Sequence, residues 1–140
     1  MTAREAALQM IYALDLGGQT TGQVTEWYTR AHPLPPTASR RAEVLLAAVV
    51  ERQAEIEALL TQHAIGWRLE RMNAVDRCVL KLAVGEMLQE EPASVREIVQ
   101  AALKLAHKFS QPAAASFIQG LLEAIARTRT SQPEVTPHAG

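Results

Sequence analysis

Arg4 and Tyr12 are the two side chains whose types and spacing point most directly to chemistry in this chain. They lie eight residues apart in a segment with helical periodicity, which places them about 80° apart around a helix, so both can border one face. An arginine can hold a phosphate while a tyrosine stacks on a base, as in many single-stranded RNA sites. The plainer interpretation is an arginine in solvent and a half-buried tyrosine, and these two residues alone favour it.

Asp76 and Arg77 form a second candidate pair, in the first turn of a helix that we expect to begin after Asn73. Asp76 suits that place because a carboxylate stabilises the positive end of the helix dipole. Two interpretations remain open for the pair. It can serve as a cap or salt bridge within the fold, or it can form part of a surface that meets a protein partner.

The residue types needed for catalysis or metal binding are sparse. No two of the four histidines are three to five residues apart, and Cys78 is the only cysteine, so zinc ligation and an internal disulfide are not expected. With no histidine near it in sequence, Cys78 is predicted to be a buried structural thiol rather than a nucleophile. The glycine-rich phosphate loop of nucleotide-binding enzymes does not occur. We therefore predict no metal, no cofactor and no enzymatic activity.

Composition favours one helical domain. The chain has 140 residues, 48% of them hydrophobic, which is enough to bury a core, and its net charge of −1 gives no overall signal for nucleic acid. No apolar run approaches the roughly 20 residues of a membrane helix, and the N-terminus does not resemble a signal peptide. The simplest expectation is a soluble cytoplasmic protein that does not enter a membrane.

The first third of the chain predicts two helices and a loop. The segment Thr2–Glu5 matches a capping box that opens a helix ending at Gly17-Gly18. A shorter helix is expected from about Thr20 to Arg30, with Val24, Trp27 and Tyr28 facing the core. The three prolines of residues 32–36 predict a loop.

The rest of the chain predicts helices around a break at Gly66. We expect one long helix from Ser39 to about His63, then a short turn at Trp67–Met72 and a helix capped by Asn73. A capping box at Ser94–Glu97 opens the next helix. Further boundaries are predicted at Glu90-Glu91-Pro92, where a helix ends, at Pro112, in the first turn of the last helix, and at Thr128, where a disordered tail begins.

No segment of useful length alternates with period two, so the predicted fold class is all-α. We expect a compact bundle of six or seven helices spanning residues 1–127. The break at Gly66 divides it into subdomains of about 1–66 and 67–127, and residues 128–140 form the tail.

Four motifs in order resemble the NusB family of bacterial transcription antitermination factors, from Arg4 to about Ala126. The most distinctive lies in residues 67–88, where W, RL, VDR, LKLA and E follow the family spacing. Residues 4–12 read REAALQMIY, similar to the family's R-E-x-A-L-Q-x-x-Y. Residues 105–109, LAHKF, resemble its L-A-K-x-F/Y, and residues 117–122, FIQGLL, resemble its F-V-N-G-x-L.

The resemblance implies an all-α fold of two helical subdomains and a partnership in transcription. It implies binding to boxA-type single-stranded RNA together with ribosomal protein S10 (NusE), in a larger complex with other Nus factors and RNA polymerase that supports ribosomal RNA transcription. The RNA contacts it implies are Arg4, Gln9, Tyr12, Phe117 and Gln119. Asp76 and Arg77 would lie in the subdomain that meets the protein partner.

Three departures from the family pattern bear on RNA binding. Met1-Thr2-Ala3 stands where relatives carry an arginine-rich segment, Gln119 replaces an asparagine, and Gln100-Ala101 replaces an asparagine–glutamate pair. Either a basic segment precedes Met1 in the natural protein or this member has lost it. We expect weak RNA binding alone and stronger binding with S10. The alternatives are a helical adaptor with weak or lost RNA binding, and the non-catalytic NusB-like domain of an RNA methyltransferase.

Overall fold

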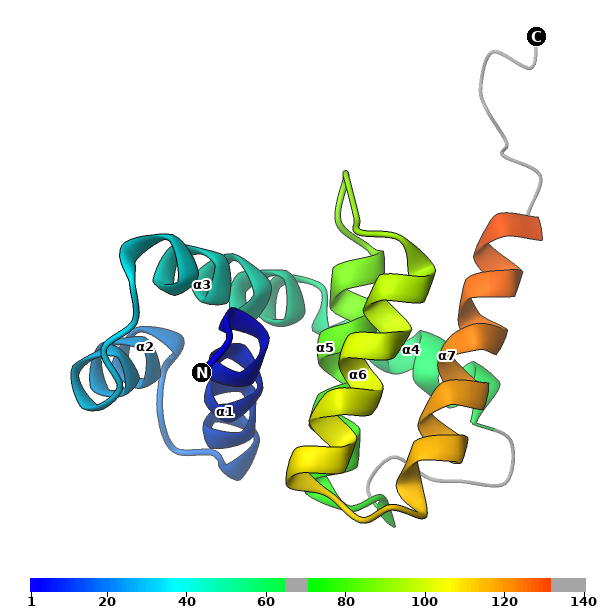
Figure 1. Cartoon of the computed structure of the whole chain (residues 1–140), viewed down its shortest axis with the longest axis horizontal. Helices are drawn as coiled ribbons and strands as arrows, with labels where there is room; N and C mark the ends of the chain where they lie inside the picture. The colour runs from blue at the N-terminus through cyan, green and yellow to red at the C-terminus, as the bar shows by residue number, and fades with distance from the viewer. Residues whose placement is uncertain (65–70, 132–140) are drawn as a thin grey trace, which may run out of the picture.

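The computed structural model describes residues 1–64 and 71–131, and within these ranges it contains seven α-helices and no strand (Figure 1). The helices are α1 (Ala3–Leu16), α2 (Thr21–Ala31), α3 (Pro36–Glu51), α4 (Gln53–His63), α5 (Ala74–Met87), α6 (Val95–Phe109) and α7 (Ala114–Ser131). The predicted all-α class is confirmed. None of the helices in this part of the chain combines the length and the apolar character needed to span a membrane.

Local capping signals explain where several helices begin. Thr2 accepts a hydrogen bond from the backbone N–H of Glu5 at 3.0 Å, and the Glu5 carboxylate accepts one from the N–H of Thr2 at 3.2 Å. Thr20 and Gln23 form the same reciprocal pair before α2. Asn73 caps α5 by accepting from the N–H of Val75. These side chains satisfy N–H groups that the first turn of a helix leaves without partners. The sequence predicted the caps at Thr2 and Asn73.

The single long helix predicted between Ser39 and His63 is wrong. The structure has two helices that meet at Arg52, whose φ of −113° and ψ of 23° interrupt the helical geometry. The Arg52 guanidinium donates to the carbonyl of Leu88 at 2.8 Å, just past the end of α5, and so ties the bend to the central helix. The first of the two helices also begins earlier, at Pro36, because the fixed φ of proline suits the first helical position.

Smaller corrections concern the last two helices. Ser94 caps α6 by accepting from the N–H of Glu97, but the Glu97 carboxylate bonds to Arg4 and does not complete the predicted capping box. Pro112 lies in the turn before α7, which begins at Ala114. That helix runs to Ser131, past the predicted start of the tail at residue 128. The rest of the predicted tail and most of the short turn expected at 67–72 lie outside the described residues.

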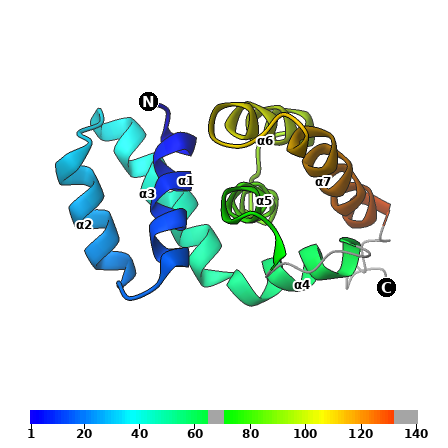
Figure 2. The same ribbon diagram turned by 90° about the horizontal axis from the view of Figure 1, so that it is seen from below.

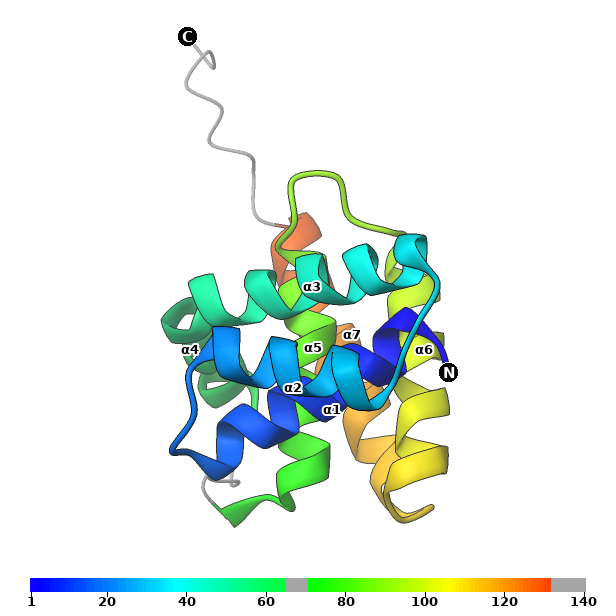
Figure 3. The ribbon, with the colours of Figure 1, turned by 90° about the vertical axis from the view of Figure 1, so that its left-hand side faces the viewer.

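Helix α5 is the centre of the core. Every residue from Cys78 to Leu88 is buried, and the helix packs against α1, α3, α4, α6 and α7 (Figure 2). At Gly85 a Cβ atom would lie 2.9 Å from Cγ2 of Val49, so glycine permits the close approach of α3. Helix α2 lies on the outer side of α1 (Figure 3), and its Trp27 is 52% exposed, which corrects the prediction that this side chain faces the core.

The helices pack in two groups around α5. Helices α1, α2 and α3 lie together on one side, and α6 and α7 lie on the other (Figure 2). Helix α4 precedes Gly66 in sequence, yet it packs against α5 and α7. The bend at Arg52 makes this possible because it turns the chain away from the direction of α3 and toward α5 and α7.

Candidate nucleic-acid interface

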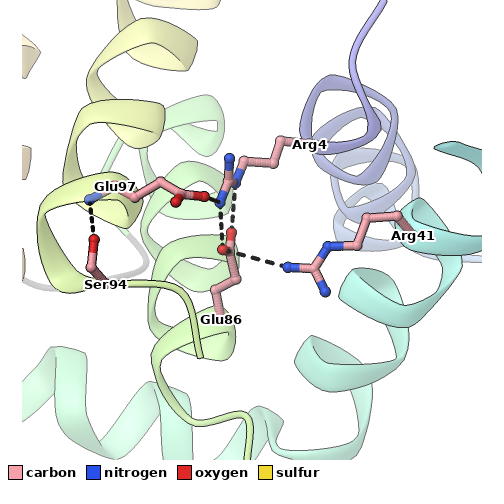
Figure 4. Close-up of polar contacts among 5 residues, drawn as sticks. All are labelled: Arg4, Arg41, Glu86, Ser94 and Glu97. Atoms are coloured by element: carbon pink, nitrogen blue, oxygen red, sulfur yellow. Dashed lines mark hydrogen bonds and ion pairs between the residues drawn. The ribbon is translucent and has the colours of Figure 1, made fainter. Parts of the chain in front are cut away.

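Arg4 is bound by carboxylates inside the fold. Its Nε and Nη2 donate to the two carboxylate oxygens of Glu86 at 2.7 and 2.6 Å, and Nη2 also contacts Glu97 at 3.2 Å (Figure 4). The Glu86 side chain is only 1% exposed, whereas that of Arg4 is 25% exposed. The hydrogen bonds that Arg4 donates to Glu86 raise the guanidinium pKa further above its usual range. The plainer expectation of an arginine in solvent is therefore wrong.

Four helices meet at this ion-pair cluster. Arg4 comes from α1, Glu86 from α5 and Glu97 from α6, while Arg41 of α3 approaches the same Glu86 carboxylate at 3.7 Å (Figure 4). A buried carboxylate is costly unless it is paired and hydrogen-bonded, and here two arginines surround it. The cluster thus fixes the start of α1 against the core.

The cluster lies at the edge of a groove of about 530 Å³ between α1, α3 and α6. We call it the charged groove. Its lining residues are Thr2, Ala3, Arg4, Glu5, Arg41, Glu97, Ala101, Lys104, Leu105 and Lys108. Lys108 pairs with Glu5 across the groove, which lowers the pKa of the Glu5 carboxyl through that hydrogen bond.

Tyr12 lines a different groove, of about 420 Å³, whose surface is mostly apolar. We call it the aromatic groove. It is lined by Leu8, Gln9, Tyr12, Ala13, Leu16, Trp27, Tyr28, His32, Val75 and Phe109. Tyr12 is 37% exposed and Trp27 is 52% exposed, whereas Tyr28 is buried and packs against the ring of His32 with the ring centres 4.6 Å apart. The groove therefore offers aromatic surface from α1, α2 and α6 to a flat apolar ligand.

Gln9 lies in the aromatic groove beside Tyr12. Its side-chain oxygen accepts a hydrogen bond from the Tyr28 hydroxyl at 2.8 Å, which fixes the orientation of the amide. With the oxygen bonded to Tyr28, the amide N–H groups are turned away from that bond. The structure thus brings two of the predicted RNA contacts, Gln9 and Tyr12, onto one surface.

Phe117 and Gln119 lie elsewhere, on α7. Phe117 is half-buried against the core, and Gln119 is exposed and donates to Glu123 at 3.3 Å. Helices α5 and α6 separate α7 from α1 (Figure 2). Neither residue lines the aromatic groove or the charged groove, so the predicted RNA contacts lie in three places: Arg4 in the charged groove, Gln9 and Tyr12 in the aromatic groove, and these two residues on α7.

Asp76 and Arg77 both have partners within the fold. The Ser110 hydroxyl, at the end of α6, donates to Asp76. Arg77 pairs with Asp15 of α1 at 2.6 Å, and each of these two side chains is 17% exposed. Asp76 itself does not line the aromatic groove, although its neighbour in sequence, Val75, does.

The remaining candidate chemistry is structural. Cys78 is fully buried, and burial raises the pKa of its thiol to about 11, so a buried structural thiol is the correct interpretation. Among the described residues no group of three His, Cys, Asp or Glu side chains is placed to hold a metal ion.

Comparison with known proteins identifies the family. The NusB family model matches residues 1–127. The chain belongs to the NusB family. Relatives described as transcription antitermination protein NusB are 33% identical in Sorangium cellulosum, 35% in Koribacter versatilis and 31% in Bacillus subtilis. These matches cover 89% of this chain in each case, and 89%, 86% and 92% of the respective relatives.

Solved structures share the NusB fold. T. maritima NusB superimposes with a TM-score of 0.82 at 23% identity, covering 89% of this chain and 88% of that one. A chain from a crystal structure of the antitermination factors NusB and NusE in complex with dsRNA gives a TM-score of 0.80 at 25% identity, covering 90% and 94%. The relatives are transcription factors of similar length, so the NusB resemblance seen in the sequence is confirmed.

Several residues of this NusB-family surface were missed by sequence reasoning. Trp27 was assigned to the core, and Phe109 was noted only as part of a motif, yet both line the aromatic groove. No sequence pattern marked three further residues as functional: Lys104 and Arg41 in the charged groove, and Ser110 beside Asp76. Each of them acquires its neighbours only when separate helices pack, so no local spacing could have revealed it.

Proposed function

We propose that this chain binds boxA-type single-stranded RNA together with ribosomal protein S10 (NusE), and that it supports antitermination during ribosomal RNA transcription. It would act in the bacterial cytoplasm, in a larger complex with other Nus factors and RNA polymerase. The observation that carries this proposal is the aromatic groove beside the exposed Tyr12, in a chain of the NusB family. The structural likeness to a chain from a complex of NusB and NusE with dsRNA supports the pairing of an RNA with NusE.

The aromatic groove suits unstacked bases. Tyr12 and Trp27 expose ring surface at its rim, and a base stacked on an aromatic side chain gains about 1–3 kcal/mol whatever its identity. The amide of Gln9 and the imidazole of His32 add polar groups to the lining, and such groups can read base edges. Phe117 and Gln119 on α7 would supply a second contact with the same strand, as the family motif implies.

The protein partner would bind beside the groove. Val75 lines the groove and Asp76 follows it, with its carboxylate oriented by Ser110. A partner that contacts Asp76 would therefore lie beside RNA bound at Tyr12. The partner and the RNA could then contact each other. Arg77 is held by Asp15, so its contribution to the partner surface is to fix the shape of this region.

A titration with RNA and partner tests the proposal. Binding of the full chain to a boxA-type RNA and to a scrambled RNA is measured with and without S10. We expect weak binding alone and tighter, boxA-selective binding with S10. Equal affinity for the two RNAs in the presence of S10, or no effect of S10, would contradict the proposal.

The adaptor alternative has one observation in its favour. Arg4 and Lys108, two of the cations nearest the start of α1, are already paired with carboxylates of this chain. An adaptor would bind S10 with ordinary affinity and show no boxA binding in the same titration. That result would replace RNA binding with protein–protein bridging as the function.

A further inference from the structure

We propose that the charged groove binds phosphate groups of the RNA backbone, with Lys104 and Arg41 as the main cations and Lys108 as a third. This inference rests on the proposed RNA-binding function and names a second part of the same site. It adds contacts on α3 and α6, which the motifs of the sequence did not indicate.

The cations of the groove differ in how far they are already neutralised. Lys104 is exposed and forms no ion pair in the described part of the chain. Arg41 is 43% exposed, and its ion pair with Glu86 is long, at 3.7 Å. Lys108 is 60% exposed and pairs with Glu5. Lys104 and Arg41 are therefore the two cations of the groove that are most available to bind an anion.

The charge of the groove favours an anion. Its lining contains four basic and two acidic side chains, and Glu86 lies beneath the floor as a third carboxylate. The groove thus keeps a net positive charge in a chain whose overall charge is −1. The first turn of α1 also borders the groove, and the positive end of the helix dipole adds partial positive charge there.

The two grooves are separate but adjoin along α1 and α6, where neighbouring residues line one or the other. On α6, Lys108 lines the charged groove and the next residue, Phe109, lines the aromatic groove. On α1, Glu5 lines the former, while Gln9 and Tyr12 line the latter at helical spacing on the same face. A strand that stacks a base on Tyr12 can therefore place a neighbouring phosphate between α1 and α6. This arrangement favours an RNA backbone, which can reach both grooves, over an isolated small anion.

The decisive variant is Lys104→Gln, because Lys104 has no ion pair with another described residue whose removal would disturb the fold. Arg41→Gln is a second variant, and Arg40→Gln is the matched control, since Arg40 is an exposed neighbour on α3 that does not line the groove. Affinity of the full chain with S10 for a boxA-type RNA is measured over a range of salt concentrations. Thermal unfolding of each variant verifies the fold.

We expect the slope of log affinity against log salt to become shallower by about 0.7 for each phosphate that the variant no longer neutralises. This should occur in Lys104→Gln and Arg41→Gln, while Arg40→Gln keeps the original slope. If Lys104→Gln binds with the original slope while Tyr12→Ala loses affinity, the groove proposal is overturned and the proposed function stands. If the unaltered chain with S10 binds no RNA, the proposed function fails and this inference fails with it.

Discussion

The two ends of α1 carry candidate RNA contacts with opposite structural roles. At its start, Arg4 is held by Glu86, a buried residue 82 positions away in sequence. Near its end, Tyr12 exposes 37% of its surface at the rim of the aromatic groove. Both residues belong to one motif and can share one face of one helix. The comparison shows that a motif can combine a residue that holds the fold with a residue that is free to bind.

The two residues differ in role because their side chains contact different surroundings where α1 packs against the other helices. Arg4 faces the only described carboxylate that is almost completely buried, and that carboxylate requires a cation. Tyr12 faces a groove whose rim is open to solvent. We therefore assign Arg4 mainly to stability and Tyr12 mainly to RNA binding.

The largest expected effect is on stability. Arg4→Ala should lower the free energy of unfolding by about 3 kcal/mol, because it leaves the buried Glu86 carboxylate with Arg41 alone, at 3.7 Å. Denaturant unfolding measures this loss. The control is Arg30→Ala, which removes an exposed pair with Glu26 and should cost no more than about 0.5 kcal/mol. If Arg4→Ala is as stable as the control but loses RNA affinity, Arg4 is an RNA contact and the assignment is wrong.

A second prediction concerns Asp15, which ties α1 to α5. Burial alone would raise its pKa, but the hydrogen bond from Arg77 and the charges of Arg77 and Lys81 outweigh burial and lower it. A lowered carboxyl pKa stabilises the fold above the ordinary Asp value of about 3.9, and this stability is lost as pH falls through the folded-state pKa. Asp15→Asn should therefore cost about 1.5–3 kcal/mol near neutral pH.

Unfolding of Asp15→Asn and the unaltered chain is compared near neutral pH and in acid. The gap between the two proteins should narrow as the pH falls. A gap that stays constant across this range would show that the Asp15 charge does not stabilise the packing of α1 on α5.

The smallest expected effect concerns the protein partner. Ser110→Ala removes the hydroxyl that orients the Asp76 carboxylate and should weaken S10 binding by about 1 kcal/mol. Ser116→Ala, at an exposed position of α7, is the matched control. Isothermal titration with S10 measures both variants. Equal S10 affinities for Ser110→Ala and the control would remove Asp76 from the proposed partner surface.

Local features were predictable from sequence, and long-range ones were not. Thr2 and Asn73 cap their helices as expected because a cap needs only residues two or three positions away. Glu97 was expected to complete a cap, but Arg4, 93 residues away, binds its carboxylate. The bend at Arg52 has no proline or glycine to mark it, and it depends on a carbonyl at the end of α5.

The candidate site follows the same rule. The family motif pointed to Gln9 and Tyr12, which share the aromatic groove because they lie on one helix face. Trp27 was placed in the core on helical spacing alone, which cannot distinguish a buried face from a groove rim. Lys104 and Arg41 come together only through the packing of α6 and α3 beside α1. Their proximity is a property of the tertiary structure.

The most direct test compares two tyrosines that line the same groove. Tyr12 is exposed, whereas Tyr28 is 1% exposed and hydrogen-bonded to Gln9. The affinity for boxA-type RNA in the presence of S10 and the free energy of unfolding are measured for Tyr12→Ala and Tyr28→Ala. We predict that Tyr12→Ala loses about 1–3 kcal/mol of RNA binding and keeps its stability, while Tyr28→Ala loses about 3 kcal/mol of stability. If Tyr12→Ala instead unfolds readily and its folded fraction binds RNA normally, Tyr12 is a core residue and the aromatic groove is not the RNA site.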